Sequence, residues 1–167
     1  AEGRPGEQLC ERAVEALARL LESPGGALWM REGNAGYQRA SHWNWGDLNG
    51  TEPADSAFIQ WLVSKQWVVD LDEMQTRRDL YGDLDAPAWI RQSDEAWLVV
   101  PLLLHDELLG FVVLKHSLGD VTFNWEVSDL LKVAARQAAA HLAQMRASNQ
   151  LIVARQFESF NRTTTFI

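Results

Sequence analysis

The sequence predicts a domain of the α+β class, with helices layered on both sides of a central β-sheet (α/β/α). Three observations predict this class. An apolar repeat of helical period lies at residues 6–21, two long apolar strands joined by an acidic turn lie at 97–104 and 108–115, and residues 124–167 contain neither glycine nor proline. Helical segments that flank strongly apolar strands are typical of sheets covered by helices.

The first helix is predicted from five apolar residues that recur at spacings of four, three, one and three. They form one helical face: Leu9, Ala13, Ala16, Leu17 and Leu20. A Ser-Pro-Gly-Gly run at 23–26 ends this helix. Two extended runs follow at 27–31 and 37–43, and the glycines and asparagine between them favour a β-hairpin turn.

The middle of the chain predicts one more helix and one more strand. Residues 45–53 are expected to form a loop, after which Asp55 or Ser56 caps a short helix that ends at Lys65. Residues 67–69 are expected to form a strand. Residues 70–95 show no clear period and are too long for a simple connection, which is typical of functional or mobile segments.

The strands at 97–104 and 108–115 give the strongest β signal. Both are apolar on both faces, which predicts central strands covered on two sides. Pro101 cannot donate to a strand ladder, so a bulge or an unpaired position is expected there.

The last helix is predicted to begin at an Asn124 cap and to run to about Arg162. Roughly 39 helical residues span about 58 Å, which exceeds the diameter of a domain of this size. The second half is therefore expected to project and to need a partner. Six residues at alternating spacings of three and four predict a coiled-coil seam: Ala135, Ala138, Leu142, Met145, Asn149 and Ile152. A single helix packed on its own domain is the alternative.

Composition and charge exclude several classes of function. The net charge of −8 argues against nucleic-acid binding, and we expect no direct contact with a membrane because the chain lacks an apolar run of spanning length. The single cysteine, Cys10, excludes a disulfide framework and a multi-cysteine zinc site, and fits a cytoplasmic location. No phosphate-binding loop, dinucleotide motif or hydrolase motif is present, so neither an enzyme nor a metal site is expected.

Four aromatic residues in the predicted loops are the candidate ligand-binding residues. They are Trp43, Trp45, Tyr81 and Trp89. Aromatic rings with a polar atom commonly line binding pockets on loops that a rigid scaffold positions. The alternative is that these rings fill the space over the sheet as core residues.

The order of the elements and two local motifs resemble the GAF domain family. Val100-Pro101-Leu102, continued by an acidic turn into residues 109–114, is similar to the central hairpin of that family. Residues 125–131, running on to Ala138-Ala139, resemble its closing helix. The resemblance covers about residues 6–148. It implies a GAF/PAS-like fold with a mostly antiparallel sheet of five to six strands, an N-terminal helix and a long C-terminal helix.

A narrower resemblance is to the GAF region of exosortase-associated (PEP-CTERM system, PrsK-type) sensor histidine kinases. It is carried by residues 67–70, 87–89 and 96–102 and above all by 154–162. The resemblance implies a sensory domain at 1–148 and, at 149–167, the start of a signalling helix that leads to a kinase core. It also implies a response regulator as partner and a parent kinase tethered to the inner membrane, with this domain in the cytoplasm. The apolar stripe of the last helix, which is longer than the domain can cover, predicts a parallel homodimer through that helix.

Other GAF subfamilies are less similar to the sequence. Cys10 is poorly placed for the covalent bilin of chromophore-binding members, and one cysteine is too few for the methionine-sulfoxide-reducing members. The cyclic-nucleotide motif is not found. The sequence therefore predicts a non-catalytic sensory domain with an unidentified ligand, and the alternative is a ligand-free dimerisation spacer.

Overall fold

The computed structural model describes residues 5–119 and 121–165. Within them six strands form one sheet in the order β3-β2-β1-β6-β5-β4, and all neighbouring pairs are antiparallel. The strands are β1 (Gly26–Arg31), β2 (Tyr37–Trp43), β3 (Thr51–Glu52), β4 (Val69–Asp70), β5 (Ala96–Leu104) and β6 (Glu107–Lys115). The predicted α+β class and strand number are confirmed. Residues 1–4, 120 and 166–167, which belong to the expected segments 1–148 and 149–167, lie outside the described residues.

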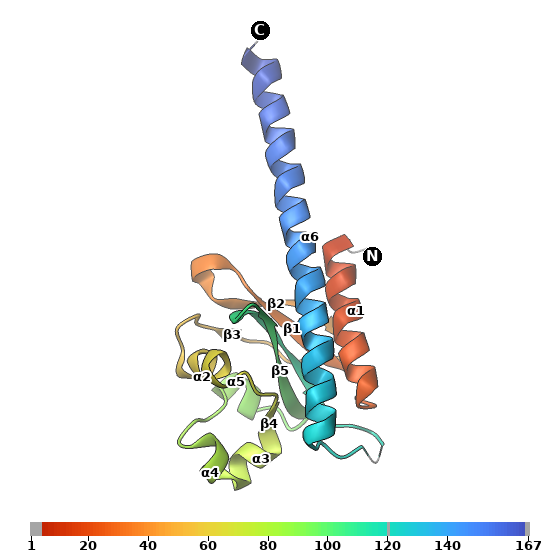
Figure 1. Ribbon diagram of the computed structural model, residues 1–167, viewed down its shortest axis with the longest axis vertical. Coiled ribbons are helices and arrows are strands. Elements are labelled where there is room, and N and C mark those ends of the chain that lie inside the picture. The colour runs from red at the N-terminus through yellow and green to blue at the C-terminus, as the bar shows by residue number, and fades with distance from the viewer. Residues whose placement is uncertain (1–4, 120, 166–167) are drawn as a thin grey trace.

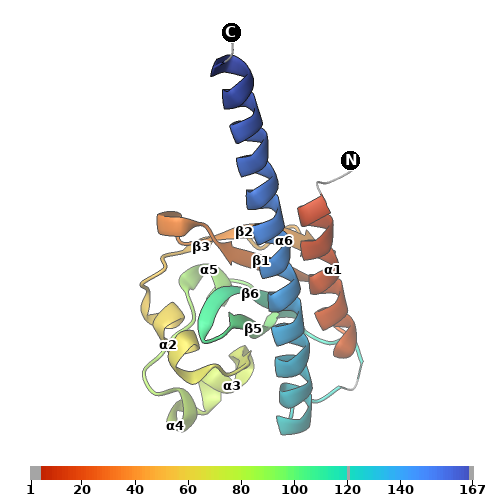
Figure 2. The same cartoon turned by 45° about the horizontal axis from the view of Figure 1, so that its top comes forward.

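The helices cover both faces of this sheet (Figure 1). They are α1 (Pro5–Leu20), α2 (Ala57–Lys65), α3 (Leu71–Thr76), α4 (Arg78–Tyr81), α5 (Ala88–Arg91) and α6 (Trp125–Thr165), with a short 3-10 turn η1 (Gly33–Ala35) between β1 and β2. Helices α1 and α6 lie side by side on one face, and α2 to α5 lie on the other (Figure 2). The result is the expected three-layer arrangement.

The β5–β6 hairpin is buried on both faces, as predicted. Phe111 and Val113 of β6 belong to the apolar cluster under α2 to α5, whereas Val112 and Leu114 belong to the cluster under α1 and α6. The hairpin turn places His105 and Asp106 at φ of 54° and 81°. Positive φ at both central residues is typical of the type I′ turn, whose twist matches that of paired strands.

The face of α1 that packs on the sheet differs from the predicted one. Buried residues of α1 include Cys10, Val14, Leu17 and Ala18, whereas Leu20 is 41% exposed. Of the five predicted face residues only Leu17 is fully buried. The reason is that α1 carries two apolar stripes, and spacing alone does not tell which stripe meets the sheet.

Helix α6 has 41 residues and begins where predicted. The Asn124 side-chain oxygen accepts a hydrogen bond from Val127 N at 2.9 Å, which caps the first turn. The first half packs on the sheet, and the second half projects beyond the domain (Figure 1). Ala135 and Leu142 are fully buried within their own domain. These two residues therefore cannot lie in an interchain seam.

The segments around β3 and β4 differ from the prediction in detail. The expected loop at 45–53 contains β3, and the expected strand at 67–69 is instead the two-residue strand Val69–Asp70. The segment at 70–95 contains three short helices. Asp70 caps the first of them by accepting hydrogen bonds from Asp72 N and Glu73 N. Among the described residues no helix is both long and apolar enough to cross a membrane.

Two leucines of α1 test how its two faces are used. Leu17→Ala should lower the free energy of unfolding by about 2–5 kcal/mol, because Leu17 is 1% exposed and its loss leaves a cavity. Leu20→Ala should cost less than about 1 kcal/mol in dilute protein, since its side chain already contacts water. Urea unfolding followed by circular dichroism measures both. Equal losses would contradict the assignment of the faces.

Candidate functional site

The four candidate aromatic residues do not converge on one cavity. Trp43 packs on the α1–α6 side, with the Arg19 guanidinium carbon 5.4 Å from its ring centroid. Trp45 is buried on the opposite side of the sheet, where Lys115 Nζ lies 5.7 Å from its ring. Tyr81 and Trp89 belong to two different groups of rings. A common pocket lined by all four is therefore not formed.

Trp89 belongs to a stack of rings on the central strands. Its ring centroid lies 4.8 Å from that of Trp29 and 6.2 Å from that of Phe111, and Trp29 and Phe111 are nearly parallel at 5.5 Å. Both indole nitrogens are satisfied, because Trp29 Nε1 donates to Gly50 O at 2.9 Å and Trp89 Nε1 donates to Glu52 Oε1 at 3.1 Å. For Trp89 the packing corresponds to the core-filling alternative.

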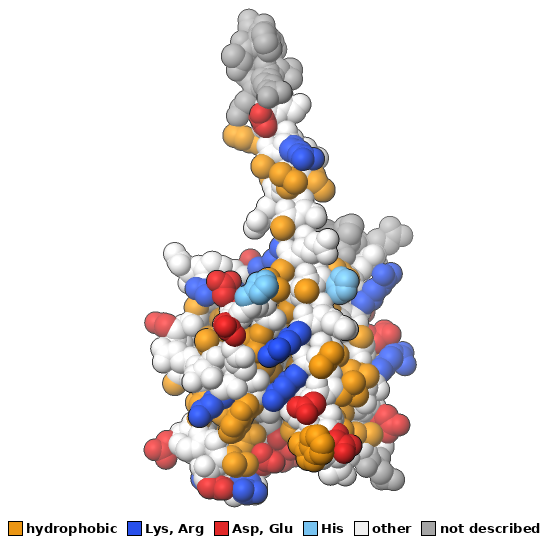
Figure 3. All heavy atoms as spheres, viewed as in Figure 1, with side chains coloured by type: hydrophobic (Ala, Val, Ile, Leu, Met, Phe, Trp, Pro, Cys, Tyr) orange, Lys and Arg blue, Asp and Glu red, His pale blue; other side chains and the backbone are white. Residues whose placement is uncertain are grey.

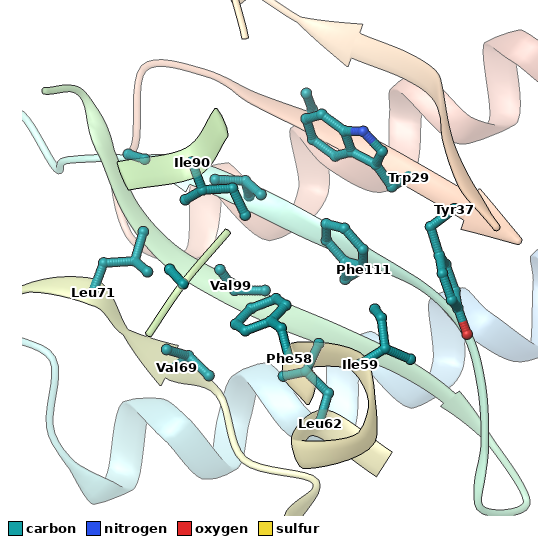
Figure 4. Close-up of a cluster of buried hydrophobic side chains, with 14 of the residues drawn as sticks. Trp29, Tyr37, Phe58, Ile59, Leu62, Val69, Leu71, Ile90, Val99 and Phe111 are labelled. Atoms are coloured by element: carbon teal, nitrogen blue, oxygen red, sulfur yellow. The ribbon is translucent and has the colours of Figure 1, made fainter. Parts of the chain in front are cut away.

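Further large side chains extend this packing along the sheet (Figure 4). Tyr37 and Phe58 both contact the Phe111 ring, with centroid separations of 5.9 and 6.4 Å. The Tyr37 hydroxyl donates to Leu108 O at 2.7 Å, and burial raises the pKa of this phenol. The part of this sheet face that surrounds Phe111 is thus filled by the chain's own aromatic rings.

The second group of rings contains Trp61, Trp67 and Tyr81. Their centroid separations lie between 5.4 and 6.1 Å, and Trp67 is perpendicular to the other two rings. The Tyr81 hydroxyl donates to Glu73 Oε1 at 3.3 Å and accepts from Asp70 N at 3.4 Å. Burial raises the pKa of Tyr81 to about 12. This group fixes α3 and α4 to the start of β4.

Next to it, a small pocket of about 210 Å³ lies between α3, α5 and the end of β6. Two pairs of polar side chains on its rim are in contact with each other. Arg78 bonds Asp85 at 3.0 Å, and His116 Nε2 lies 3.6 Å from Asp72. A ligand would have to compete with these pairs.

A larger apolar groove of about 400 Å³ runs between α1 and α6. Its lining includes Ala13, Ala16, Leu17, Leu20, Ala134, Ala138 and His141. Leu9 also lines the groove, so all five α1 residues singled out by sequence spacing are among its lining residues. The predicted α1 stripe is therefore the wall of a groove that is open to solvent.

The predicted seam residues of α6 divide into two sets. Ala135 and Leu142 are buried in the domain, whereas Ala138 lines the groove. Met145 is partly buried beside Gly6 of α1, and Asn149 and Ile152 are exposed where α6 projects. Of these six residues, Ala138, Met145, Asn149 and Ile152 are accessible to a partner.

Among the described residues, few side chains are arranged as catalytic groups would be. Within residues 5–119 and 121–165 no three histidine, cysteine or acidic side chains gather as a metal site would require. Cys10 is buried, and this burial raises the pKa of its thiol, which disfavours the nucleophilic thiolate. Sequence reasoning missed Trp29 as the centre of the aromatic stack. Its place in an apolar strand was the available signal.

Comparisons with known proteins agree with this architecture. The family model for the GAF domain matches residues 5–142. No curated protein sequence matches the chain.

Three solved structures show the same fold. A GAF/HD domain protein from Geobacter sulfurreducens is 12% identical, with a TM-score of 0.65 over 86% of this chain and 95% of its own. The GAF-B domain of DevS from Mycobacterium smegmatis is 16% identical, with a TM-score of 0.60 over 87% and 98%. Residues 122–287 of a methyl-accepting chemotaxis protein are 15% identical, with a TM-score of 0.60 over 85% and 91%.

Substitution of Gly50 tests whether the aromatic stack is rigid core. A Cβ at Gly50 would overlap the Trp89 indole, whereas a Cβ at Gly46 would have His42 Cε1 as its nearest neighbour at 3.8 Å. Gly50→Ala should therefore lower the free energy of unfolding by about 1–3 kcal/mol, and Gly46→Ala should change it little. Thermal unfolding compares the two variants. A harmless Gly50→Ala would show that Trp89 moves freely.

The titration of Tyr81 tests its burial. Tyr37 and Tyr81 are the only two tyrosines, so Tyr37→Phe leaves Tyr81 as the single phenol. Its absorbance at 295 nm should titrate near pH 12 rather than near 10. Because the folded-state pKa is raised, its stability contribution is full below pH 10 and is lost as pH rises through 12. A midpoint near 10 in folded protein would contradict the buried contact with Glu73.

Proposed function

This chain belongs to the GAF domain family, and we propose that it is a non-catalytic regulatory domain that transmits a signal through a homodimer formed by α1 and α6. The structural likeness to domains of DevS and of a chemotaxis protein supports a sensory role. The scarcity of catalytic groups among the described residues supports a regulatory domain over an enzyme.

The observation that carries the proposal is the exposed apolar surface on the projecting half of α6. Leu151, Ile152, Val153 and Phe157 are each more than half exposed. Figure 3 shows hydrophobic side chains on this part of the helix, where the domain offers nothing to cover them. An isolated helix is marginal in water, so a second copy of α6 is the partner that stabilises it.

The groove between α1 and α6 continues the same surface onto the domain. Its small side chains, mostly alanines, let a second helix approach closely, and Leu20 supplies a larger exposed contact. Since the groove and the exposed residues beyond Met145 lie on the same helix, one partner helix can cover both. A parallel pair of chains would form a bundle of two α1 and two α6 helices.

Burial within the domain changes the seam that this dimer uses. Ala134 and His141 face the groove together with the predicted Ala138, so Ala134 and His141 take the seam positions expected for Ala135 and Leu142. Beyond the domain the seam continues through Met145, Asn149 and Ile152, as the sequence spacing predicts. We propose that Asn149 fixes the register of the two helices there.

We further propose that the parent protein is an exosortase-associated (PEP-CTERM, PrsK-type) sensor histidine kinase. In this proposal α6 leads to a kinase core that phosphorylates a response regulator, the parent is tethered to the inner membrane, and this domain lies in the cytoplasm. The support is the resemblance of residues 67–70 and 154–162 to that kinase family, together with a helix that leaves the domain as a rigid rod.

A ligand-free dimerisation spacer is the second candidate function. The ring stack of Trp29, Trp89 and Phe111 favours it, because this stack fills the part of the sheet face under α2 to α5 that surrounds Phe111. A spacer would dimerise without responding to any small molecule. Ligand binding that changes α6 would therefore separate the two functions.

Charge placed in the groove should break the dimer. Leu20→Glu puts two like charges at the α1 surface of a parallel pair and should raise the dimer dissociation constant at least about tenfold. Val63→Glu is the matched control, since Val63 of α2 is 39% exposed, close to the 41% of Leu20, but lies on the other side of the sheet. Multi-angle light scattering measures the mass of each variant. The proposal would be contradicted if the wild type were a monomer at high micromolar concentration, or if both variants had the same dimer dissociation constant.

Truncation after Ser148 tests the division of the chain. The shortened protein should keep the folded domain, because the buried residues of α6 lie before this point. It should associate more weakly, since the projecting half is gone. Circular dichroism and light scattering give the two answers. A truncated chain that fails to fold would contradict a domain that ends at 148.

A further inference from the structure

A separate cleft of about 260 Å³ lies where α6 begins, between that helix and the α3–α4 side of the domain. It is distinct from the filled sheet face and from the α1–α6 groove, because it shares no lining residue with the groove and is bounded by the outer side of the second ring group. Figures 1 and 2 show the first turns of α6 near α3. Its two walls have different chemistry.

The wall formed by the domain is aromatic and acidic. The partly exposed ring of Trp67 lines this wall beside Tyr81, whose own ring is buried against Trp61. Glu73 contributes a carboxylate that accepts a hydrogen bond from the Tyr81 hydroxyl. Lys65 Nζ already lies over the Trp67 ring, 5.7 Å from its centroid. This wall therefore suits an ammonium group, which gains from ring faces and from a nearby carboxylate.

The wall formed by α6 is polar. Asn124, Ser128 and Lys132 follow one another at intervals of four and so lie on one side of the helix. The Asn124 side chain is used as the helix cap, but no ion pair or hydrogen bond joins the Lys132 ammonium to any described residue. Glu73 and Lys132 thus line the same cleft without pairing.

Two further aromatic rings border the cleft. Phe123 packs on the core beside it, whereas Trp125 is 73% exposed. The Trp125 indole therefore offers an apolar ring with a polar N–H that a ligand in the cleft can contact. The cleft is therefore lined by four rings and by one group of each charge.

We propose that this cleft binds a small zwitterion that carries a substituted ammonium group and a carboxylate, as betaines and amino acids do. The ammonium lies among the rings beside Glu73, and the carboxylate meets Lys132 and Ser128. The ligand bridges the domain and the first turns of α6. The inference deepens the proposed function, on whose signalling role for α6 it rests, by placing the input of the sensor at the start of that helix.

Three small molecules test the required charges. Glycine betaine carries both groups, choline has the same ammonium without the carboxylate, and 3,3-dimethylbutanoate replaces the ammonium nitrogen by carbon. Isothermal titration calorimetry on the full chain should give an affinity for glycine betaine at least about tenfold higher than for either analogue. No binding of glycine betaine, or an equal affinity for all three, would overturn the proposal.

Variants test which wall of the cleft binds the ammonium group and which binds the carboxylate. Glu73→Gln should weaken glycine betaine binding, and Lys132→Met should remove the preference for glycine betaine over choline. Trp125→Ala should weaken binding by about 3- to 30-fold. Phe157→Ala is the control, because Phe157 is also an exposed aromatic residue of α6 but lies far along the helix from the cleft. Equal losses in the control and in Trp125→Ala would overturn the site.

The experiment distinguishes failure of the site from failure of the dimer. Calorimetry reports binding to the cleft whether the chain is a monomer or a dimer, and light scattering on the same samples reports association. Binding without dimerisation would leave the site standing and remove the proposed function. Dimerisation without binding of glycine betaine would overturn the proposed site and leave the proposed dimer standing.

Discussion

The β5–β6 hairpin is the constraint on which the rest of the structure depends. Because both of its faces are apolar, each face must be covered, and the remaining elements divide between these two tasks. The long helices α1 and α6 cover one face, and the short helices α2 to α5 cover the other. Covering a sheet with α6 uses only one side of that helix and only its first half. Its other surfaces remain exposed to solvent, and the proposed dimer uses them.

Helix α6 is held to the domain by its packed face and by a polar contact where it leaves the domain. At this exit Arg146 donates to Arg31 O at 2.8 Å and to Glu32 Oε1 at 2.7 Å. The second contact is an ion pair between α6 and the turn that follows β1. At its start, Asn124 caps the first turn of the helix itself. A displacement at this first turn is carried along the helix to the projecting half, since a continuous helix transmits rotation and translation without an intervening hinge.

The parts that sequence predicts well are those with many residues in one pattern. The central hairpin and α6 each repeat their period over a long stretch, and Asn124 has the side chain that a helix cap requires. The four-residue helices α4 and α5 are too short to show a period, and β3 pairs through only two residues. The sequence does not show whether an aromatic residue fills the core or lines a pocket, because that depends on neighbours far away in sequence. Trp89 illustrates this, since it lies in α5 whereas its partner Trp29 lies in β1, far away in sequence.

Energetics decide where an input can act on this domain. A ligand on the filled sheet face would have to displace a ring such as Trp89, and uncovering roughly 150–250 Å² of apolar surface costs about 4–6 kcal/mol. A dissociation constant of 1 μM corresponds to a binding free energy of about 8 kcal/mol, so opening the core would offset most of that free energy. The cleft beside Trp125 is already open and requires no such displacement. A ligand there also contacts α6 directly, so its binding free energy can favour one position of the helix over another, which is the condition for shifting an equilibrium. In the proposed mechanism the packed core and the open cleft are therefore complementary, because the core provides a rigid surface against which a ligand in the cleft favours one position of α6.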